Sequence, residues 1–126
     1  MSKILVVEDI DKVRKAVVAV LEGPGGHDVI SARDGQEGLS LLDQHTFDVA
    51  ITDIWMPGED GIAFLRQAKA KHPELPVIVI TGGGPNFPPM EMSLAVVKSH
   101  GADAVLIKPF ENAELLAVIE TVRACP

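Results

Sequence analysis

Five short runs of mostly apolar residues, rich in valine and isoleucine, recur along the chain. They read KILVV, DVISA, DVAIT, PVIVI and AVLIK and cover residues 3–7, 28–32, 48–52, 76–80 and 104–108. Four of them are apolar almost throughout, which is typical of strands covered on both faces of a sheet. The run at 28–32 is the most polar, so we predict that it forms an edge of the sheet.

Between these runs, apolar residues return every three or four positions, as they do in a helix with one buried face. The residues with this spacing are Val13, Val17, Leu21, Leu39, Leu42, Ile62, Leu65, Leu115, Ile119 and Val122. Asp34, followed three residues later by Glu37, forms a capping pair that indicates a helix start. Asp60 and Asn112 stand at two further expected starts. Strand and helix therefore alternate five times.

Regular alternation of strand and helix predicts right-handed crossovers and a parallel sheet with helices on both faces. We expect one α/β domain over residues 1–126, with five strands and five helices. One segment, TGGGPNFPPMEM at 81–92, contains three glycines and three prolines, which oppose regular structure. The fourth helix is therefore expected to start late, from about Met90.

Composition narrows the class of protein. A chain of 126 residues with 47% apolar and 23% charged residues is ordinary for a globular domain. No apolar run approaches the ~18 residues of a membrane span, and the N-terminal apolar stretch is too short for a signal peptide. The single cysteine, Cys125, has no partner for an internal disulfide, which favours a reducing compartment. We therefore predict a cytoplasmic protein without a membrane partner.

Charge indicates the kind of partner. The formal net charge of −7 argues against direct binding to nucleic acid, because neutralising phosphates requires a basic face. A cation suits the chain better.

Polar residues follow the strand ends, where an open parallel sheet binds its ligands. They are Glu8, Asp9, Asp53, Thr81 and Lys108. Three carboxylates within about 5 Å of one another would repel by roughly 3 kcal/mol per pair at an effective dielectric of about 20. One lysine cannot neutralise them, so the cluster requires a further cation. Oxygen ligands with room for water and phosphate are those that Mg²⁺ prefers.

The group after the fourth strand suits an anion. Thr81 and the amides of Gly82 and Gly83 offer hydrogen-bond donors to an anion placed between the metal and Lys108. A carboxylate is a competent nucleophile toward phosphorus and forms an acyl phosphate. Phosphoryl transfer is catalysed mainly by positioning and charge neutralisation, so this set of residues favours phosphoryl chemistry at Asp53.

Four fragments in order resemble a response regulator receiver domain of two-component signal transduction, along the whole chain. They are VVED after the first strand, DIWMPGEDG around Asp53, TG after the fourth strand and KPF after the fifth. The resemblance implies a single receiver domain with a flavodoxin-like, doubly wound sheet of order 2-1-3-4-5 and five helices. In that order the first and third strands are neighbours, which brings Asp9 next to Asp53.

The resemblance also implies a metal site. Asp9 and Asp53 would bind Mg²⁺ directly and Glu8 largely through a water molecule. The backbone carbonyl of Trp55 would complete the protein ligands, and Mn²⁺ is the alternative ion.

The resemblance further implies that Asp53 takes a phosphoryl group from a phosphohistidine of a sensor histidine kinase or histidine phosphotransfer protein. Lys108 would pair with one phosphoryl oxygen, and Thr81 would bind another. Water would later hydrolyse the acyl phosphate, so the chain would be a self-modifying switch rather than a turnover enzyme. The phosphorylated face would bind a downstream protein or output domain. Whether the chain also forms a homodimer is left open.

Two features depart from the family pattern. Val105 stands three residues before Lys108, where family members commonly carry Tyr or Phe as a rotamer switch. The spacing of 27 residues from Thr81 to Lys108 is longer than usual, and the excess falls in the proline-rich loop 82–90. We hypothesise that this loop, which contains Phe87, carries the signal in place of an aromatic residue at 105.

Three other functions are compatible with parts of this pattern. A haloacid-dehalogenase-like phosphatase requires a second Asp two positions after the nucleophile, where this chain has Trp55. A flavodoxin-type cofactor binder requires a phosphate loop after the first strand, where this chain has EDIDKV. A pseudo-receiver, acting as a phosphorylation-independent protein-binding module, is the alternative that remains.

Overall fold

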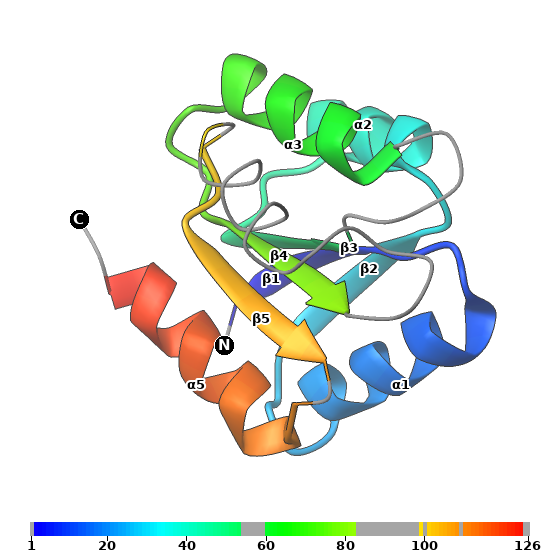
Figure 1. Ribbon diagram of the computed structural model, residues 1–126, viewed down its shortest axis with the longest axis vertical. Coiled ribbons are helices and arrows are strands. Elements are labelled where there is room, and N and C mark those ends of the chain that lie inside the picture. The colour runs from blue at the N-terminus through cyan, green and yellow to red at the C-terminus, as the bar shows by residue number, and fades with distance from the viewer. Residues whose placement is uncertain (1, 54–59, 83–98, 100, 109, 125–126) are drawn as a thin grey trace.

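A parallel sheet lies between two layers of helices in the computed structural model (Figure 1). The structure describes residues 2–53, 60–82, 99, 101–108 and 110–124, with the backbone alone at 60, 82, 108 and 124. The five strands follow the order β2-β1-β3-β4-β5, and every pair of neighbours is parallel. Both the predicted strand order and the predicted edge position of residues 28–32 are confirmed.

The elements match the expected alternation. The strands are β1 (Lys3–Val7), β2 (Asp28–Ala32), β3 (Val49–Asp53), β4 (Val77–Gly82) and β5 (Ala104–Lys108). The helices are α1 (Asp11–Glu22), α2 (Gly35–Gln44), α3 (Asp60–Lys71) and α5 (Asn112–Ala124). The late fourth helix, expected from about Met90, lies outside the described residues. None of the helices in the described ranges is long and apolar enough to cross a membrane.

Two strands end further along the chain than expected. β3 covers 49–53 rather than 48–52, so Asp53 is its last residue and not the first residue after it. β4 extends to Gly82, because β5 pairs with it up to Lys108. The predicted site residues Asp53 and Thr81 therefore belong to the hydrogen-bonded ladder itself, which fixes their backbones.

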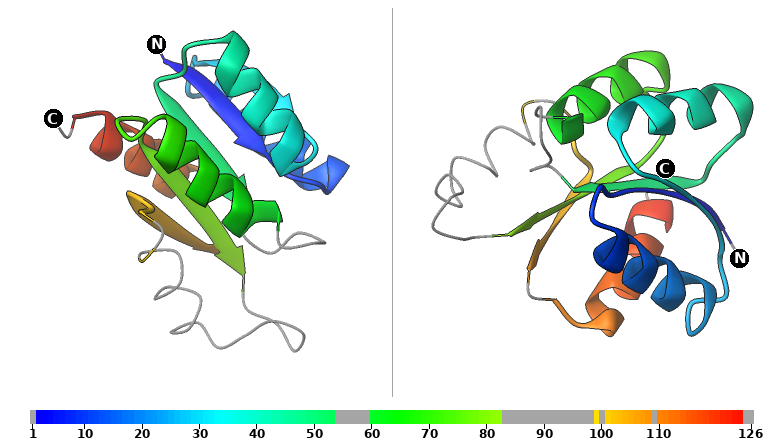
Figure 2. Two further views of the ribbon diagram at one scale, coloured as in Figure 1. Left: turned by 90° about the horizontal axis from the view of Figure 1, so that it is seen from above. Right: turned by 90° about the vertical axis from the view of Figure 1, so that its right-hand side faces the viewer.

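The two faces of the sheet bury separate sets of strand residues, and each set packs under its own pair of helices (Figure 2). Under α2 and α3 lie Leu5, Val7, Ala50, Val77 and Val79. Under α1 and α5 lie Ile4, Val6, Val49, Ile51, Ile78 and Ile80. This alternation explains why the central strands are apolar at nearly every position, since both faces are covered.

Helix α2 begins at its predicted cap and packs closely on the sheet. The Oδ1 atom of Asp34 accepts a hydrogen bond of 2.8 Å from the amide of Glu37, which confirms the capping pair. At Gly38 a Cβ atom would lie 2.8 Å from both a ring carbon of Phe64 and a methyl carbon of Val7. A side chain there would push α2 away from β1 and α3, so this position requires glycine for close approach.

A partly buried lysine connects α3 to the amino end of β5. Lys69, whose side chain is 18% exposed, donates hydrogen bonds of 3.0 Å to the Leu75 carbonyl and to Oδ2 of Asp103. The same carboxylate oxygen accepts a bond of 2.8 Å from the amide of Val77. One lysine therefore connects the end of α3, the turn that follows it and the start of the β4–β5 pair.

Replacing Lys69 with methionine should lower the free energy of unfolding by about 1–3 kcal/mol, because two acceptors lose a charged donor. Lys71→Met is the matched control, since the side chain of Lys71 is 55% exposed and its ion pair with Asp43 is long, at 3.9 Å. That control should change stability by less than about 0.5 kcal/mol. Urea denaturation measures both variants, and equal losses would show that the Lys69 contacts contribute nothing specific.

Candidate functional site

The register of the sheet sets Glu8 beside Asp53. The residues just before them, Val7 and Thr52, are paired across β1 and β3. Both acids therefore lie at the carboxyl edge of the sheet, where ligands bind in open parallel folds. Glu8 is 3% exposed and Asp53 is 7% exposed.

The buried carboxyl of Asp53 strongly influences that of Glu8. Burial is the main cause that raises the pKa of Glu8, followed by a hydrogen bond to Asp53 and repulsion from its charge, and together they raise it to about 8. A weaker contribution comes from a hydrogen bond with Asp9, while the amide of Ile10, which donates to Glu8 Oε1 at 3.2 Å, acts in the opposite direction. Burial and the adjacent Asp53 carboxyl thus both disfavour the charged form of Glu8, so a pKa of about 8 means that Glu8 keeps its proton near neutral pH. A divalent cation in the place of that proton would relieve the same repulsion.

The donor set fits a hard cation such as Mg²⁺. Glu8, half-buried Asp9 and Asp53 offer only oxygen ligands, and two of the three are buried together. The described ranges contain no group of three or more His, Cys, Asp or Glu side chains that could hold a metal ion by themselves. Mg²⁺ commonly uses one or two carboxylates together with water and phosphate, so a complete protein cage is not required. The predicted fourth ligand, the carbonyl of Trp55, lies outside the described residues.

Thr81 brings an unsatisfied hydroxyl to the same edge. Asp53 pairs with Ile80 across β3 and β4, so Thr81 lies one residue beyond that pair. Its side chain is 1% exposed, and Oγ1 has no hydrogen-bond partner among the described residues. A buried hydroxyl without a partner is unfavourable by about 1–3 kcal/mol, and such groups often mark a ligand position. Thr81 therefore offers a free donor beside the acids.

The remaining predicted residues are described only in part. The backbone of Lys108 pairs with Gly82 at the end of β5, which places both at the carboxyl edge. The side chain of Lys108, the amide of Gly83 and the residues around Phe87 lie outside the described part of the chain. Val105 is half-buried and packs against the core on the side of α2 and α3.

Two residues that bear on the site were not predicted. The buried hydroxyl of Thr52 donates a hydrogen bond of 2.9 Å to the backbone carbonyl of Asp53. Arg14 donates one of 3.0 Å to the backbone carbonyl of Glu8. Each contact is to the backbone of an acid and not to its carboxylate. The sequence did carry a signal for Arg14, since a cation in the first turns of a helix opposes the helix dipole and needs a compensating partner.

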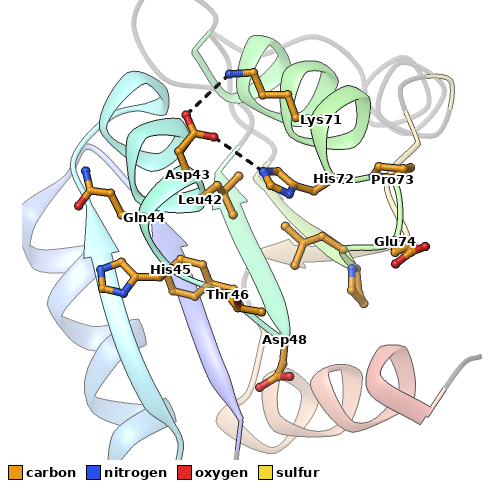
Figure 3. A pocket seen from close by; sticks show the side chains of 13 residues that line it. Leu42, Asp43, Gln44, His45, Thr46, Asp48, Lys71, His72, Pro73 and Glu74 are labelled. Atoms are coloured by element: carbon orange, nitrogen blue, oxygen red, sulfur yellow. Dashed lines mark ion pairs between the residues drawn. The ribbon is translucent and has the colours of Figure 1, made fainter.

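A hollow of about 700 Å³ lies at the opposite edge of the sheet, between the turn from α2 to β3 and the turn from α3 to β4 (Figure 3). Asp43 in its wall is 3.9 Å from the amine of Lys71 and 4.0 Å from Nε2 of His72. These partly exposed pairs contribute little to stability. Because this edge carries the amino ends of the strands, the hollow does not belong to the site around Asp53.

Comparison with known proteins connects the fold and the site to one family. The family model of the response regulator receiver domain matches residues 4–120. The virulence transcriptional regulatory protein PhoP of Salmonella typhimurium is 35% identical over 117 residues, which cover 93% of this chain and 50% of PhoP. The transcriptional regulatory protein CpxR of Klebsiella pneumoniae is 34% identical over 122 residues, which cover 97% of this chain and 49% of CpxR. The chain thus spans about half the length of these curated relatives.

A solved structure matches over nearly its full length. The receiver domain of NtrX from Brucella abortus is similar with a TM-score of 0.86 and 32% sequence identity. The match covers 98% of this chain and 99% of that domain. Fold and sequence therefore agree over the same range, including the sheet edge that carries Glu8 and Asp53.

Proposed function

The chain belongs to the family of response regulator receiver domains, and on that premise we propose that Asp53 takes a phosphoryl group from a phosphohistidine. Receiver domains of this family are phosphoryl-accepting signalling switches, and the function predicted at that level is confirmed. The observation that carries the proposal for Asp53 is its burial at the tip of a central strand, in contact with Glu8. The phosphohistidine would belong to a sensor histidine kinase or a histidine phosphotransfer protein.

The transfer itself would require little more than alignment. A carboxylate oxygen of Asp53 would attack phosphorus while the bond from phosphorus to the imidazole nitrogen breaks. The acyl phosphate remains on Asp53, and the donor histidine leaves with its electron pair and takes up a proton. β3 is buried and paired on both sides, so the attacking group is already held in place.

Receiver domains generally bind Mg²⁺ in their acidic pocket. In this chain Glu8, Asp9, Asp53 and the Trp55 carbonyl would hold it, with Mn²⁺ as the alternative ion. When bound, the ion would supply positive charge that offsets the acids and the phosphoryl oxygens. The raised pKa of Glu8 supports this assignment, since burial and then the neighbouring Asp53 carboxyl disfavour a negative charge that no cation offsets.

The phosphoryl oxygens would meet donors from the last two strands. The unsatisfied hydroxyl of Thr81 would donate to one oxygen, and the amine of Lys108 would pair with another. The amides of Gly82 and Gly83 would serve as further donors. The pairing of Gly82 with Lys108 supports this set, because it holds both backbones at the edge where Thr81 lies.

The proposed cycle describes a switch, not a turnover enzyme. Phosphorylation at Asp53 would change a face that binds a downstream protein or an output domain, and water would later remove the group. We propose that this happens in the cytoplasm, within one receiver domain over residues 1–126, and without direct contact to nucleic acid, given the net charge of −7. A homodimer is compatible with this scheme, and the loop around Phe87 stays our hypothesis for the output.

The test is incubation with Mg²⁺ and acetyl phosphate, followed by intact-mass measurement. The wild type should gain one phosphoryl group, and Asp53→Asn should gain none, because an amide cannot form the acyl phosphate. Asp43→Asn is the matched control, since Asp43 is an exposed acid at the opposite edge, and it should be modified like the wild type. A folded wild type without an adduct would favour the pseudo-receiver alternative, and an adduct on Asp53→Asn would place the acceptor elsewhere.

A further inference from the structure

Arg14 occupies an unusual place in the first turns of α1. Its side chain is only 12% exposed. The guanidinium donates from Nη1 to the Glu8 carbonyl at 3.0 Å, and its Nη2 forms an ion pair with the carboxylate of Asp11. This cation therefore reaches back from the helix to the strand tip that carries the acidic pocket.

The turn that Arg14 holds lacks the usual side-chain cap. The N-cap residue of α1 is Ile10, which makes no capping hydrogen bond and is 52% exposed. Among the described residues, the side chains of Glu8 and Arg14 hydrogen-bond to this turn, and Oε1 of Glu8 accepts from the Ile10 amide at 3.2 Å. Glu8 is also a proposed metal ligand, so its carboxylate serves two partners. Arg14 restrains the turn without using a carboxylate of the pocket.

The helix dipole does not explain why a cation lies in the first turns of α1. The positive end of the helix dipole disfavours cations in the first turns of α1. Asp11 compensates, because its carboxylate forms an ion pair with the Arg14 guanidinium. Asp11 thereby holds the guanidinium on the backbone of Glu8.

We propose that Arg14 is a positioning residue of the acidic pocket. By donating to the Glu8 carbonyl, Arg14 fixes the turn from which Glu8 and Asp9 present their oxygens. The carboxylate of Asp11 meanwhile neutralises the charge of the guanidinium. The inference rests on the proposed function, because it concerns residues assigned there to the metal.

The direction of the change in Mg²⁺ affinity distinguishes a positioning role from a purely electrostatic effect of a nearby charge. Removing a positive charge close to an acidic pocket strengthens cation binding by electrostatics alone. Removing the hydrogen bond that fixes the turn (the brace) weakens cation binding, because the metal ligands must then be ordered when the ion binds. Arg14→Gln removes both the charge and the brace, so the direction of its effect shows which is larger. Arg14→Lys keeps the charge but lacks the fork that reaches two partners at once.

The experiment is a titration of the full chain with Mg²⁺, followed by the fluorescence of Trp55, the only tryptophan, and by calorimetry. We expect Arg14→Gln and Arg14→Lys to weaken Mg²⁺ binding by about 10-fold, as loss of an outer contact to metal ligands commonly does. Arg33→Gln is the matched control, because the side chain of Arg33 is 73% exposed and its ion pair with Glu37 is long, at 3.9 Å. It should leave the dissociation constant within about twofold of the wild type. The unfolding temperatures and the amide NMR signals of Asp9 and Ile10 are recorded without metal, where the Arg14 variants alone should shift those signals.

Each outcome decides between the possibilities. Tighter or unchanged Mg²⁺ binding by folded Arg14→Gln would overturn the inference and leave the proposed function intact. Weaker binding by Arg14→Gln with unchanged binding by Arg14→Lys would also overturn it, since a single amine would then suffice and the two-partner contact of the guanidinium would contribute nothing. A wild type that binds no Mg²⁺ would contradict the proposed function itself. If Arg14→Gln does not fold, the Arg14→Lys result alone decides.

Discussion

Without divalent cations, the free energy of unfolding should fall as the pH rises from about 5 to about 8. Glu8 has a raised pKa of about 8 in the folded protein, against an ordinary value of 4.5 for a glutamate carboxyl in water. Between these two values the folded chain keeps a proton that the unfolded chain has lost. Stability therefore decreases with pH in this window, and the loss levels off once the folded carboxyl also ionises. We expect a total change of about 2–4 kcal/mol.

Glu8→Gln should remove most of this pH dependence, because glutamine stays neutral while it retains a hydrogen-bonding side chain of similar size. Urea denaturation in EDTA at about pH 5, 7 and 8.5 measures the slope. Glu22→Gln, at an exposed position of α1, is the control and should keep the wild-type slope. Mg²⁺ should stabilise the wild type more at the highest pH than at the lowest, since protons and the ion compete for the same carboxylates. A flat wild-type profile in EDTA would contradict the coupling between Glu8 and Asp53.

Thr81→Val should make the unphosphorylated domain more stable and its phosphorylation slower. Valine has nearly the shape of threonine, but it removes a buried hydroxyl that has no partner among the described residues. We expect a gain of about 1 kcal/mol in the free energy of unfolding. The same change removes the proposed donor to the phosphoryl oxygens, so the rate of modification by acetyl phosphate should fall by about 10-fold or more.

The control for Thr81→Val is a variant that keeps the hydroxyl group. Thr81→Ser keeps the hydroxyl and should retain most of the phosphorylation rate, although loss of a buried methyl group should lower stability by about 1 kcal/mol. Opposite signs for stability and rate in Thr81→Val would indicate that the hydroxyl is kept for function at the expense of stability. A decrease in both the stability and the phosphorylation rate of Thr81→Val would instead indicate that Oγ1 makes a stabilising contact in the unphosphorylated protein.

The arrangement of the sheet could be predicted from the sequence because it depends on simple patterns. Continuous apolar runs indicated strands buried on both faces, and the polar run at 28–32 indicated the edge. The ends of β3 and β4 were less predictable. Neither is set by local residue preferences: β4 continues to Gly82 because the neighbouring β5 offers partners up to Lys108. Pairing between strands, rather than the apolar run itself, decides where a strand stops.

The acids of the site could be found because strand ends converge in any parallel sheet. The strand order predicted Asp9 next to Asp53, whereas the register of β1 and β3 sets Glu8 beside Asp53. The contacts of Thr52 and Arg14 could not be found in this way. Both donate to backbone carbonyls, and every residue has one, so the sequence does not mark the acceptor. The buried state of Thr81 was also hidden, since a threonine at a strand end is ordinary until its surroundings are known.

The position of Asp53 on β3 determines which parts of the molecule can respond to modification. All five residues of Val49–Asp53 are buried, and the strand is paired with both β1 and β4. Such a strand is among the last segments to open in a folded domain. If Asp53 is the acceptor, as proposed, this strand would be a fixed support for the phosphoryl group, and the added charge would have to displace the surroundings of Asp53 instead. Amide exchange should therefore stay slow along β3 in both states, and the difference between them should fall in the turns that meet its tip.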